Sequence, residues 1–176
     1  ISDYGYGVVT PSLAANLTGF ARGKPVTLDS RYDLLRYPDV SATTPNEEEA
    51  AAAAGVSLLD ENGNGENIRF VAETLQSALD CQAVLITRGS RGMSLFTDGL
   101  AAHLPVHGTD QVADVTGAGD TVIGTFALGL AAGASPIEAA LLADYAGGVV
   151  VMKMGTATLT PDELSHAIAS DPRPAA

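Results

Sequence analysis

The sequence predicts an α/β domain in which a mainly parallel sheet is covered by helices on both faces. Short apolar runs of strand length alternate along the chain with longer segments of helical periodicity, and this alternation is typical of parallel sheets. Residues 83–87 are apolar up to the last position, as expected for a strand buried on both faces. A chain of 176 residues, 46% of them hydrophobic, is long enough to bury one core.

Strands are expected at residues 1–3, 26–29, 42–44, 83–87, 93–97 and 101–106. The first of these reads as the end of a buried strand, and Pro45 stops the third because proline cannot donate to a sheet ladder. Asp98 and Gly99 form a turn signal between two strand-like runs, which predicts a hairpin.

Helices are expected at residues 11–22, 47–54, 68–79, 119–132, 136–151 and 161–169. Pro11 suits the first position of a helix, and Gly23 suits its end. Two helices carry an apolar side with helical spacing, formed by Leu13, Leu17, Phe20 and Ala21 in the first and by Phe70, Val71, Leu75 and Leu79 in the third.

Residues 1–170 are expected to form one domain, and residues 171–176 a tail or linker. The net charge of −12 argues against a nucleic-acid or anionic-membrane surface, since such surfaces need basic patches. Cys81 is the single cysteine, which excludes a disulfide framework and a cysteine-based zinc site. Without a signal peptide or an apolar run of transmembrane length, the expected location is the cytoplasm.

The most informative segment is the glycine-rich run from Asp114 to Asp120, which opens a long apolar helix. Gly117 and Gly119 permit a tight turn and a close approach of the backbone to a ligand. The first amides of a helix lack internal partners and carry the positive end of the helix dipole, so they suit phosphate. Asp120 would then take the proton of a hydroxyl that attacks phosphorus. The alternative is an ordinary glycine-rich helix start in which Asp120 complements the dipole.

Five segments together resemble the PfkB/ribokinase family of carbohydrate kinases, in the order and at the spacing of that family. They are residues 2–5 (SDYG), 44–49 (TPNEEE), 87–92 (TRGSRG), 114–124 (DVTGAGDTVIG) and 153–157 (KMGTA). Within the family, residues 26–31 (VTLDSR), followed by TPNEEEA at residues 44–50, are most similar to the kinase domain of bacterial D-glycero-β-D-manno-heptose-7-phosphate kinase/ADP-heptose synthase proteins. The resemblance implies a ribokinase-like three-layer α/β/α fold. It also implies that this is the C-terminal, nucleotide-binding part of a kinase domain, which would be inactive in isolation.

The resemblance implies an ATP-dependent transfer of the γ-phosphoryl group to a sugar or sugar-phosphate hydroxyl. Asp120 matches the catalytic base, and Gly117, Ala118 and Gly119 match the anion hole. The residues implied at the nucleotide are Thr87, Gly89, Gly92, Thr116, Asp144 and Gly155. From the residues alone, an ordinary loop between strands remains the alternative for the 87–92 turn.

Asn46 and Glu49 match a family element that organises Mg²⁺ through water, and Asp114 matches a position that helps to bind a monovalent cation such as K⁺. Main-chain carbonyls near residues 154–158 would complete the cation site. From the residues alone, Asn46 is an N-cap and Glu49 completes a capping-box-like arrangement, which is compatible with the metal role. Glu47 and Glu48 are expected to be solvated.

Tyr6 stands where heptose-type relatives usually have Lys, and Asp144 where relatives have Asn, so the details of substrate and nucleotide binding stay open. His103, His107 and His166 form no close-spaced ligand set and are expected at the surface or in packing.

The acceptor that the resemblance favours is O1 of heptose 7-phosphate. The alternatives are a family kinase for ribose, fructose or a nucleoside, and a non-catalytic nucleotide-binding relative. A dinucleotide-binding oxidoreductase fails because the GAGD run does not match GxGxxG. The expected partners are ATP and the sugar, with a homodimer and a fused nucleotidyltransferase domain as further associations implied by the relatives.

Overall fold

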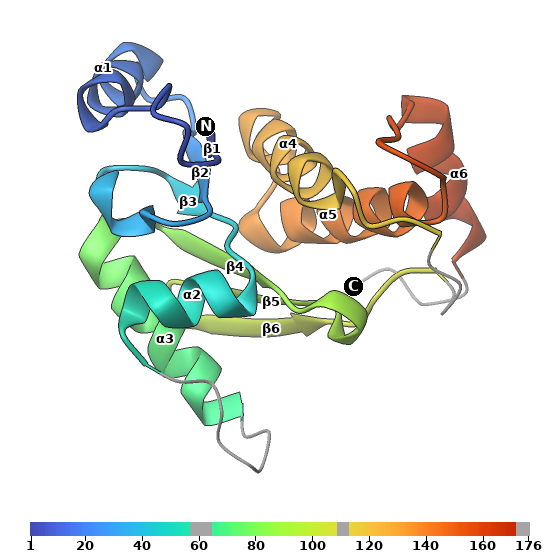
Figure 1. Cartoon of the computed structure of the whole chain (residues 1–176). Coiled ribbons are helices and arrows are strands. Elements are labelled where there is room, and N and C mark those ends of the chain that lie inside the picture. The colour runs from blue at the N-terminus through green and yellow to red at the C-terminus, as the bar shows by residue number, and fades with distance from the viewer. Residues whose placement is uncertain (57–64, 109–112, 172–176) are drawn as a thin grey trace.

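The computed structural model describes residues 1–56, 65–108 and 113–171, and it has three layers with a sheet in the middle (Figure 1). The strands are β1 (Ser2–Asp3), β2 (Thr27–Ser30), β3 (Ala42–Thr43), β4 (Ala83–Thr87), β5 (Met93–Thr97) and β6 (Leu100–Leu104), in this order across the sheet. The pairs from β1 to β4 are parallel, whereas β4–β5 and β5–β6 are antiparallel. The prediction of a mainly parallel sheet that ends in a hairpin is therefore confirmed.

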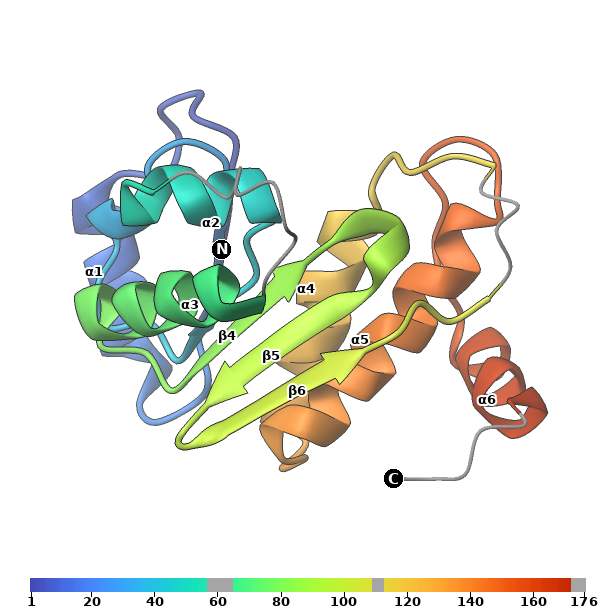
Figure 2. The ribbon, with the colours of Figure 1, turned by 90° about the horizontal axis from the view of Figure 1, so that it is seen from below.

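The helices are α1 (Pro11–Ala21), α2 (Glu47–Ala54), α3 (Gly65–Leu79), α4 (Ala118–Ala131), α5 (Pro136–Val151) and α6 (Pro161–Ser170), with 3₁₀ turns η1 (Leu34–Arg36) and η2 (Gly89–Arg91). The connections between the parallel strands advance in one direction across the sheet. Since such crossovers share one hand, they leave the sheet on one side. The helices α2 and α3 accordingly lie on one face, and α4 and α5 lie on the other (Figure 2).

The core lies on both sides of β4, because successive side chains of a strand point to opposite faces. Val84 and Ile86 pack in the cluster beneath α3, with Val71 and Leu75. Leu85 packs in the cluster beneath α4 and α5, which is centred on buried side chains such as Leu95, Val122, Phe126 and Ala143. The apolar run at 83–87 is therefore a strand buried on both faces, as predicted.

The predicted apolar side of α1 is not a core face. Ala14 is its buried residue, whereas Leu13, Leu17 and Phe20 are exposed, Phe20 by 76%. The helix lies beside the edge strand β1, where there is little sheet for it to cover (Figure 1). Phe70 on α3 is also exposed, although the rest of its predicted apolar side is buried.

Helix ends follow local capping signals, with small differences from the prediction. The helix α1 ends at Ala21 and is capped by Arg22, whose φ is +50°, so the left-handed turn begins one residue before Gly23. The predicted tail lies outside the described residues from position 172 onward. None of the helices in the described ranges is long and apolar enough to cross a membrane.

Candidate functional site

The carboxyl ends of β3 and β4 bring two of the sequence motifs together. The amide of Thr87 donates to the carbonyl of Pro45 at 2.9 Å, and Asn46 forms an isolated parallel bridge with Thr87. The 44–49 segment and the 87–92 turn are therefore side by side at one edge of the sheet. In parallel α/β sheets, ligands bind outside this edge.

Asn46 and Glu49 form a complete capping box at the start of α2. Asn46 Oδ1 accepts from the amide of Glu49 at 2.9 Å, and Glu49 Oε2 accepts from the amide of Asn46 at 2.9 Å. The capping alternative is thus confirmed, and it leaves Glu49 Oε1 available for a further role.

Glu47 is not solvated as predicted, because its side chain is only 17% exposed and pairs with two arginines. Arg88 Nε donates to its carboxylate at 2.8 Å, and Arg91 bonds the other carboxylate oxygen. These ion pairs connect α2 to η2 and restrict the position of the 87–92 turn relative to α2.

A cavity of about 540 Å³ lies between this turn, the start of α4 and one side of α5. Its lining contains Thr87, Gly89, Gly92, Ala118, Gly119 and Asp144 among the predicted site residues. The other lining residues are mainly apolar and include Met93, Val106, Val115, Val122 and Val151. A cavity of this size, apolar with a few convergent polar groups, is typical of a small-molecule site.

Two glycines shape the walls of the cavity by close backbone contact. Gly92 has φ +79°, and a Cβ there would lie 2.0 Å from the carbonyl oxygen of Leu104. A Cβ at Gly148 on α5 would lie 2.3 Å from the carbonyl oxygen of His107. Only glycine fits at either position without a backbone shift.

His107 packs against its neighbours, as expected, and it also lines the cavity. Its Nδ1 lies 3.2 Å from Asp171 Oδ2, and its ring centroid lies 4.4 Å from that of Tyr145. Tyr145 also donates to Asp171 at 2.9 Å. The signal in the sequence is the Gly147-Gly148 pair, which leaves room on α5 for another segment.

The start of α4 presents its amides in a different pattern from the predicted one. Gly117 is the N-cap, and the amide of Ala118 donates to the carbonyl of Val115 at 3.1 Å. Among the described residues, no acceptor is found for the amides of Gly117, Gly119 and Asp120. Two of the three predicted donors, Gly117 and Gly119, are therefore suited to an anion, whereas Ala118 is not, and Asp120 adds a further amide.

Asp114 joins two loops rather than lining the cavity. Its carboxylate accepts from the amide of Thr116 at 2.9 Å and from the amide of Gly155 at 3.1 Å. Hydrogen bonds from Thr116 first, and then from Gly155, hold the pKa of Asp114 below its usual value. Thr116 and Gly155 are not among the lining residues, and the carbonyl of Thr158 accepts from Lys153 Nζ at 2.8 Å. The K⁺ role stays a prediction.

Asp120 is exposed on the first turn of α4 and contacts β1 and the residue that follows it. Ser2 Oγ donates to its Oδ1 at 3.2 Å, and the Tyr4 hydroxyl donates to its Oδ2 at 3.0 Å. Tyr4 of the SDYG segment and Asp120 of the glycine-rich segment, which are 116 residues apart in the chain, are therefore in contact.

Asp29 has a raised pKa that depends in part on two predicted site residues, and the sequence does not single it out. Burial first, and then the charges of Glu49 and Asp120, raise its pKa to about 6. Three carboxylates therefore share one region, and oxygen donors of this kind suit Mg²⁺. In the described part of the chain, no three His, Cys, Asp or Glu side chains are close enough to hold a metal directly. The arrangement fits an ion that keeps waters between itself and the protein.

Comparisons with known proteins agree with this geometry. A family model described as pfkB family carbohydrate kinase matches residues 14–163. The bifunctional protein HldE of Trichlorobacter lovleyi is 42% identical over 177 residues, which cover 98% of this chain and 35% of that protein. The HldE protein of a Caulobacter species is 45% identical over 98% of this chain and 36% of its own length. The chain thus spans about a third of the length of the curated relatives it matches.

Solved structures share the fold. Ribokinase of Arabidopsis thaliana, complexed with ribose and ATP, superposes with a TM-score of 0.79 at 23% identity, over 92% of this chain and 52% of that one. Phosphofructokinase-2 of Escherichia coli, in complex with substrates and products, has a TM-score of 0.79 at 20% identity, over 96% and 54%. The three-layer fold of the chain is therefore ribokinase-like.

Proposed function

Because the chain belongs to the pfkB family of carbohydrate kinases, we propose that it supplies the ATP-binding and phosphoryl-transfer side of a kinase for a sugar or sugar phosphate. The observation that carries this proposal is the cavity between α5 and the 87–92 turn, whose lining includes Gly119 at the start of α4. The apolar part suits the adenine base, and the amides at the helix start suit phosphate.

In the proposed reaction, Asp120 accepts the proton of the acceptor hydroxyl as its oxygen bonds to the γ-phosphorus of ATP. The bond from the γ-phosphorus to the bridging oxygen breaks, and ADP leaves. The amides of Gly119 and Asp120 stabilise negative charge on the phosphoryl group, a contribution of about 3–4 kcal/mol per donor in enzymes. Asn46 and Glu49 would hold Mg²⁺ through water, with Asp29 adding charge, and the ion would neutralise the phosphates.

The proposed acceptor is the O1 hydroxyl of heptose 7-phosphate. Support comes from the 42–45% identity to HldE proteins over almost the whole chain and from the resemblance of residues 26–31, followed by TPNEEEA at residues 44–50, to heptose-type kinases. The same relatives support a second, nucleotidyltransferase activity in the full-length protein. Ribose, fructose and a nucleoside are the competing acceptors.

The test is a coupled assay of ADP release by the full-length protein with MgATP and each of the four acceptors. Heptose 7-phosphate is expected to give the highest kcat/KM. A higher kcat/KM for another sugar would contradict the proposed acceptor but would still support the proposed kinase activity. ATP binding without transfer to any of them would favour the non-catalytic nucleotide-binding alternative.

A further inference from the structure

The segment of residues 2–5, which comprises β1 (Ser2–Asp3) and the two residues after it, presents alternate side chains to two different sites. Because successive residues of an extended chain point to opposite faces, Ser2 and Tyr4 share one face and Asp3 points to the other. Ser2 and Tyr4 both donate to Asp120, one to each carboxylate oxygen. Asp3 is buried, with 6% exposure, on the opposite side.

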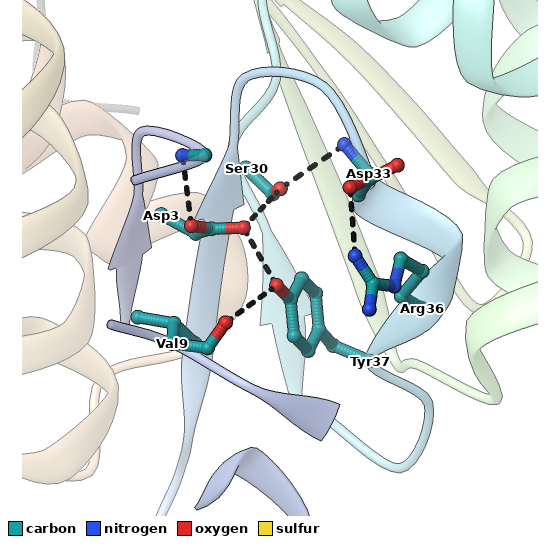
Figure 3. Close-up of polar contacts among 7 residues, drawn as sticks. Asp3, Val9, Ser30, Asp33, Arg36 and Tyr37 are labelled. Carbon is teal, nitrogen blue, oxygen red and sulfur yellow. Dashed lines mark hydrogen bonds and ion pairs between the residues drawn. The ribbon is translucent and has the colours of Figure 1, made fainter. Parts of the chain in front are cut away.

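Asp3 is the anchor of this segment (Figure 3). Its carboxylate accepts from the Tyr37 hydroxyl at 2.6 Å, from Ser30 Oγ at 3.2 Å and from the amide of Gly5 at 2.9 Å. Burial alone would raise the pKa of Asp3, but these hydrogen bonds, that of Tyr37 first, outweigh it and hold the pKa below its usual value. The charged, fully bonded carboxylate fixes the backbone on both sides of Tyr4.

We propose that Tyr4 and Ser2 are positioning residues that hold the carboxylate of Asp120 in the orientation that accepts the proton of the acceptor hydroxyl. The proposal rests on the proposed kinase function. Asp120 is exposed on the first helical turn, so without these donors its side chain would be free to rotate. A carboxylate has about four acceptor sites. With one donor on each oxygen, sites remain for the acceptor hydroxyl.

The hydroxyl of Tyr4 is suited to this task because it stays protonated. Burial first, and then the hydrogen bond and charge of Asp120, raise the pKa of Tyr4 above its usual value. Tyr4 therefore donates throughout the pH range in which a kinase works.

A first experiment tests the contact without any activity. In the full-length protein labelled with ¹³C at the tyrosine Cζ, Tyr4→Phe assigns the Tyr4 signal. Asp120→Asn is then expected to lower the pH at which Tyr4 ionises, because a neutral amide no longer disfavours the phenolate. The Tyr37 signal is the internal control, since its pKa of about 12 depends on burial and Asp3. An unchanged Tyr4 titration would overturn the proposal.

A second experiment tests positioning by kinetics. Tyr4→Phe keeps the ring and is expected to lower kcat about 10- to 100-fold, as small misplacements of a catalytic group do, while KM for ATP changes less than twofold. Tyr32→Phe is the matched control, because Tyr32 is exposed and no hydrogen bond of its hydroxyl is found in the described structure. Equal effects of the two changes would overturn the proposal.

Combining the changes separates positioning from a structural role. If Tyr4 acts through Asp120, then Tyr4→Phe causes no further loss in the Asp120→Asn background. If the two changes lower kcat independently and their effects add, the positioning role of Tyr4 is contradicted. A normal kcat for Tyr4→Phe beside an impaired Asp120→Asn enzyme would refute positioning and leave the proposed kinase intact, whereas a normal kcat for Asp120→Asn would refute the base itself.

Discussion

Asp29 shows how burial and neighbouring charges act on a single carboxylate of this molecule. Its pKa is raised to about 6, against about 3.9 in an unfolded chain. Between these two values the folded chain binds more protons than the unfolded chain. The free energy of unfolding therefore falls as the pH rises from about 4 to about 6.

Replacing Asp29 with Asn is expected to stabilise the chain at pH 7.5 by about 1–2 kcal/mol, less than the full value for two pKa units because solvent screens the site. Near pH 4 the gain should vanish, since the native residue is then neutral. Urea unfolding in Mg²⁺-free buffer at both pH values measures this. Asp98→Asn on an exposed turn is the charge control. An equal gain at both pH values would show that burial of the Asp29 charge is not the cause of the effect.

Asp120→Asn in the full-length protein is expected to lower kcat by about 10²–10⁴-fold, the usual contribution of a positioned base. The affinity for ATP should change little, because the cavity residues and the amides at the start of α4 remain. Steady-state kinetics and nucleotide titration measure the two effects separately. Near-normal turnover would remove Asp120 from the mechanism.

Glu49 combines a capping role with a proposed metal role, and Glu49→Gln separates them. Gln can still complete a capping box, so the free energy of unfolding should change little. The loss of charge should raise the Mg²⁺ concentration for half-maximal activity by about 10-fold.

Glu138→Gln is the matched control for Glu49→Gln, because Glu138 forms the same capping box with Ser135 at the start of α5. It should leave the Mg²⁺ dependence unchanged. Identical metal titrations of the two variants would leave Glu49 as a helix cap alone.

At the scale of elements, small residues allow neighbouring segments to pack closely against α5. A Cβ at Gly147 would lie 3.1 Å from Val122 Cγ2 of α4, and a Cβ at Gly129 of α4 would lie 2.9 Å from Ala139 Cβ of α5. Gly148 receives the backbone of His107. Small residues thus set the distances between α4, α5 and the segment after β6, and these distances define the cavity.

Gly148→Ala is expected to lower the free energy of unfolding by about 1–3 kcal/mol and to weaken nucleotide binding, because the carbonyl of His107 must move away from the new methyl group. Gly124→Ala on α4 is the matched control, since nothing lies within 4 Å of its Cβ position. That change should stabilise the helix by up to about 1 kcal/mol. Similar effects of the two changes would contradict the close contact.

The elements that the sequence predicts well are those with local signals. Asn46, Ser135 and Thr160 each begin a helix with a capping box, and the predicted starts of α2, α5 and α6 are confirmed. The predictions that were wrong concern residues whose surroundings are formed by segments distant in the chain. The sequence places Glu47 in solvent because its partner Arg88 lies 41 residues away in the chain. Helical spacing alone could not show that Phe20 is exposed.

The candidate site divides in the same way. The glycine-rich turns and Asp120 carry a pattern within a few residues, so they could be predicted, and the cavity brings many of them together. Asp29 and His107 have no such pattern. Asp29 acquires its raised pKa only when folding buries it in β2 and brings the charges of Glu49 and Asp120 near it. His107 reaches the cavity only because Gly148 admits its backbone.

At the scale of the whole molecule, a net charge of −12 has to be reconciled with the proposed ligand, a nucleotide that is itself strongly negative. The long-range electrostatic interaction between the chain and the nucleotide would be repulsive. The binding free energy therefore has to come from hydrogen-bond donors at short range and from Mg²⁺. The amides of Gly119 and Asp120 supply fixed donors, and the carboxylates of Asp29 and Glu49 suit the ion. ATP should therefore bind far better with Mg²⁺ than without it.

The 176 residues expressed alone are expected to bind MgATP without phosphorylating a sugar. The chain covers only 52–54% of the ribokinase and phosphofructokinase chains it superposes on, and transfer needs acceptor and phosphate held together, which supplies about 7–11 kcal/mol of the barrier. At 100 times Kd, MgATP should add about 2.7 kcal/mol to the free energy of unfolding and raise Tm by about 5–10 °C. Thermal unfolding with and without Mg²⁺, beside a coupled assay, measures both. Robust sugar phosphorylation by these residues alone would show that they also hold the acceptor.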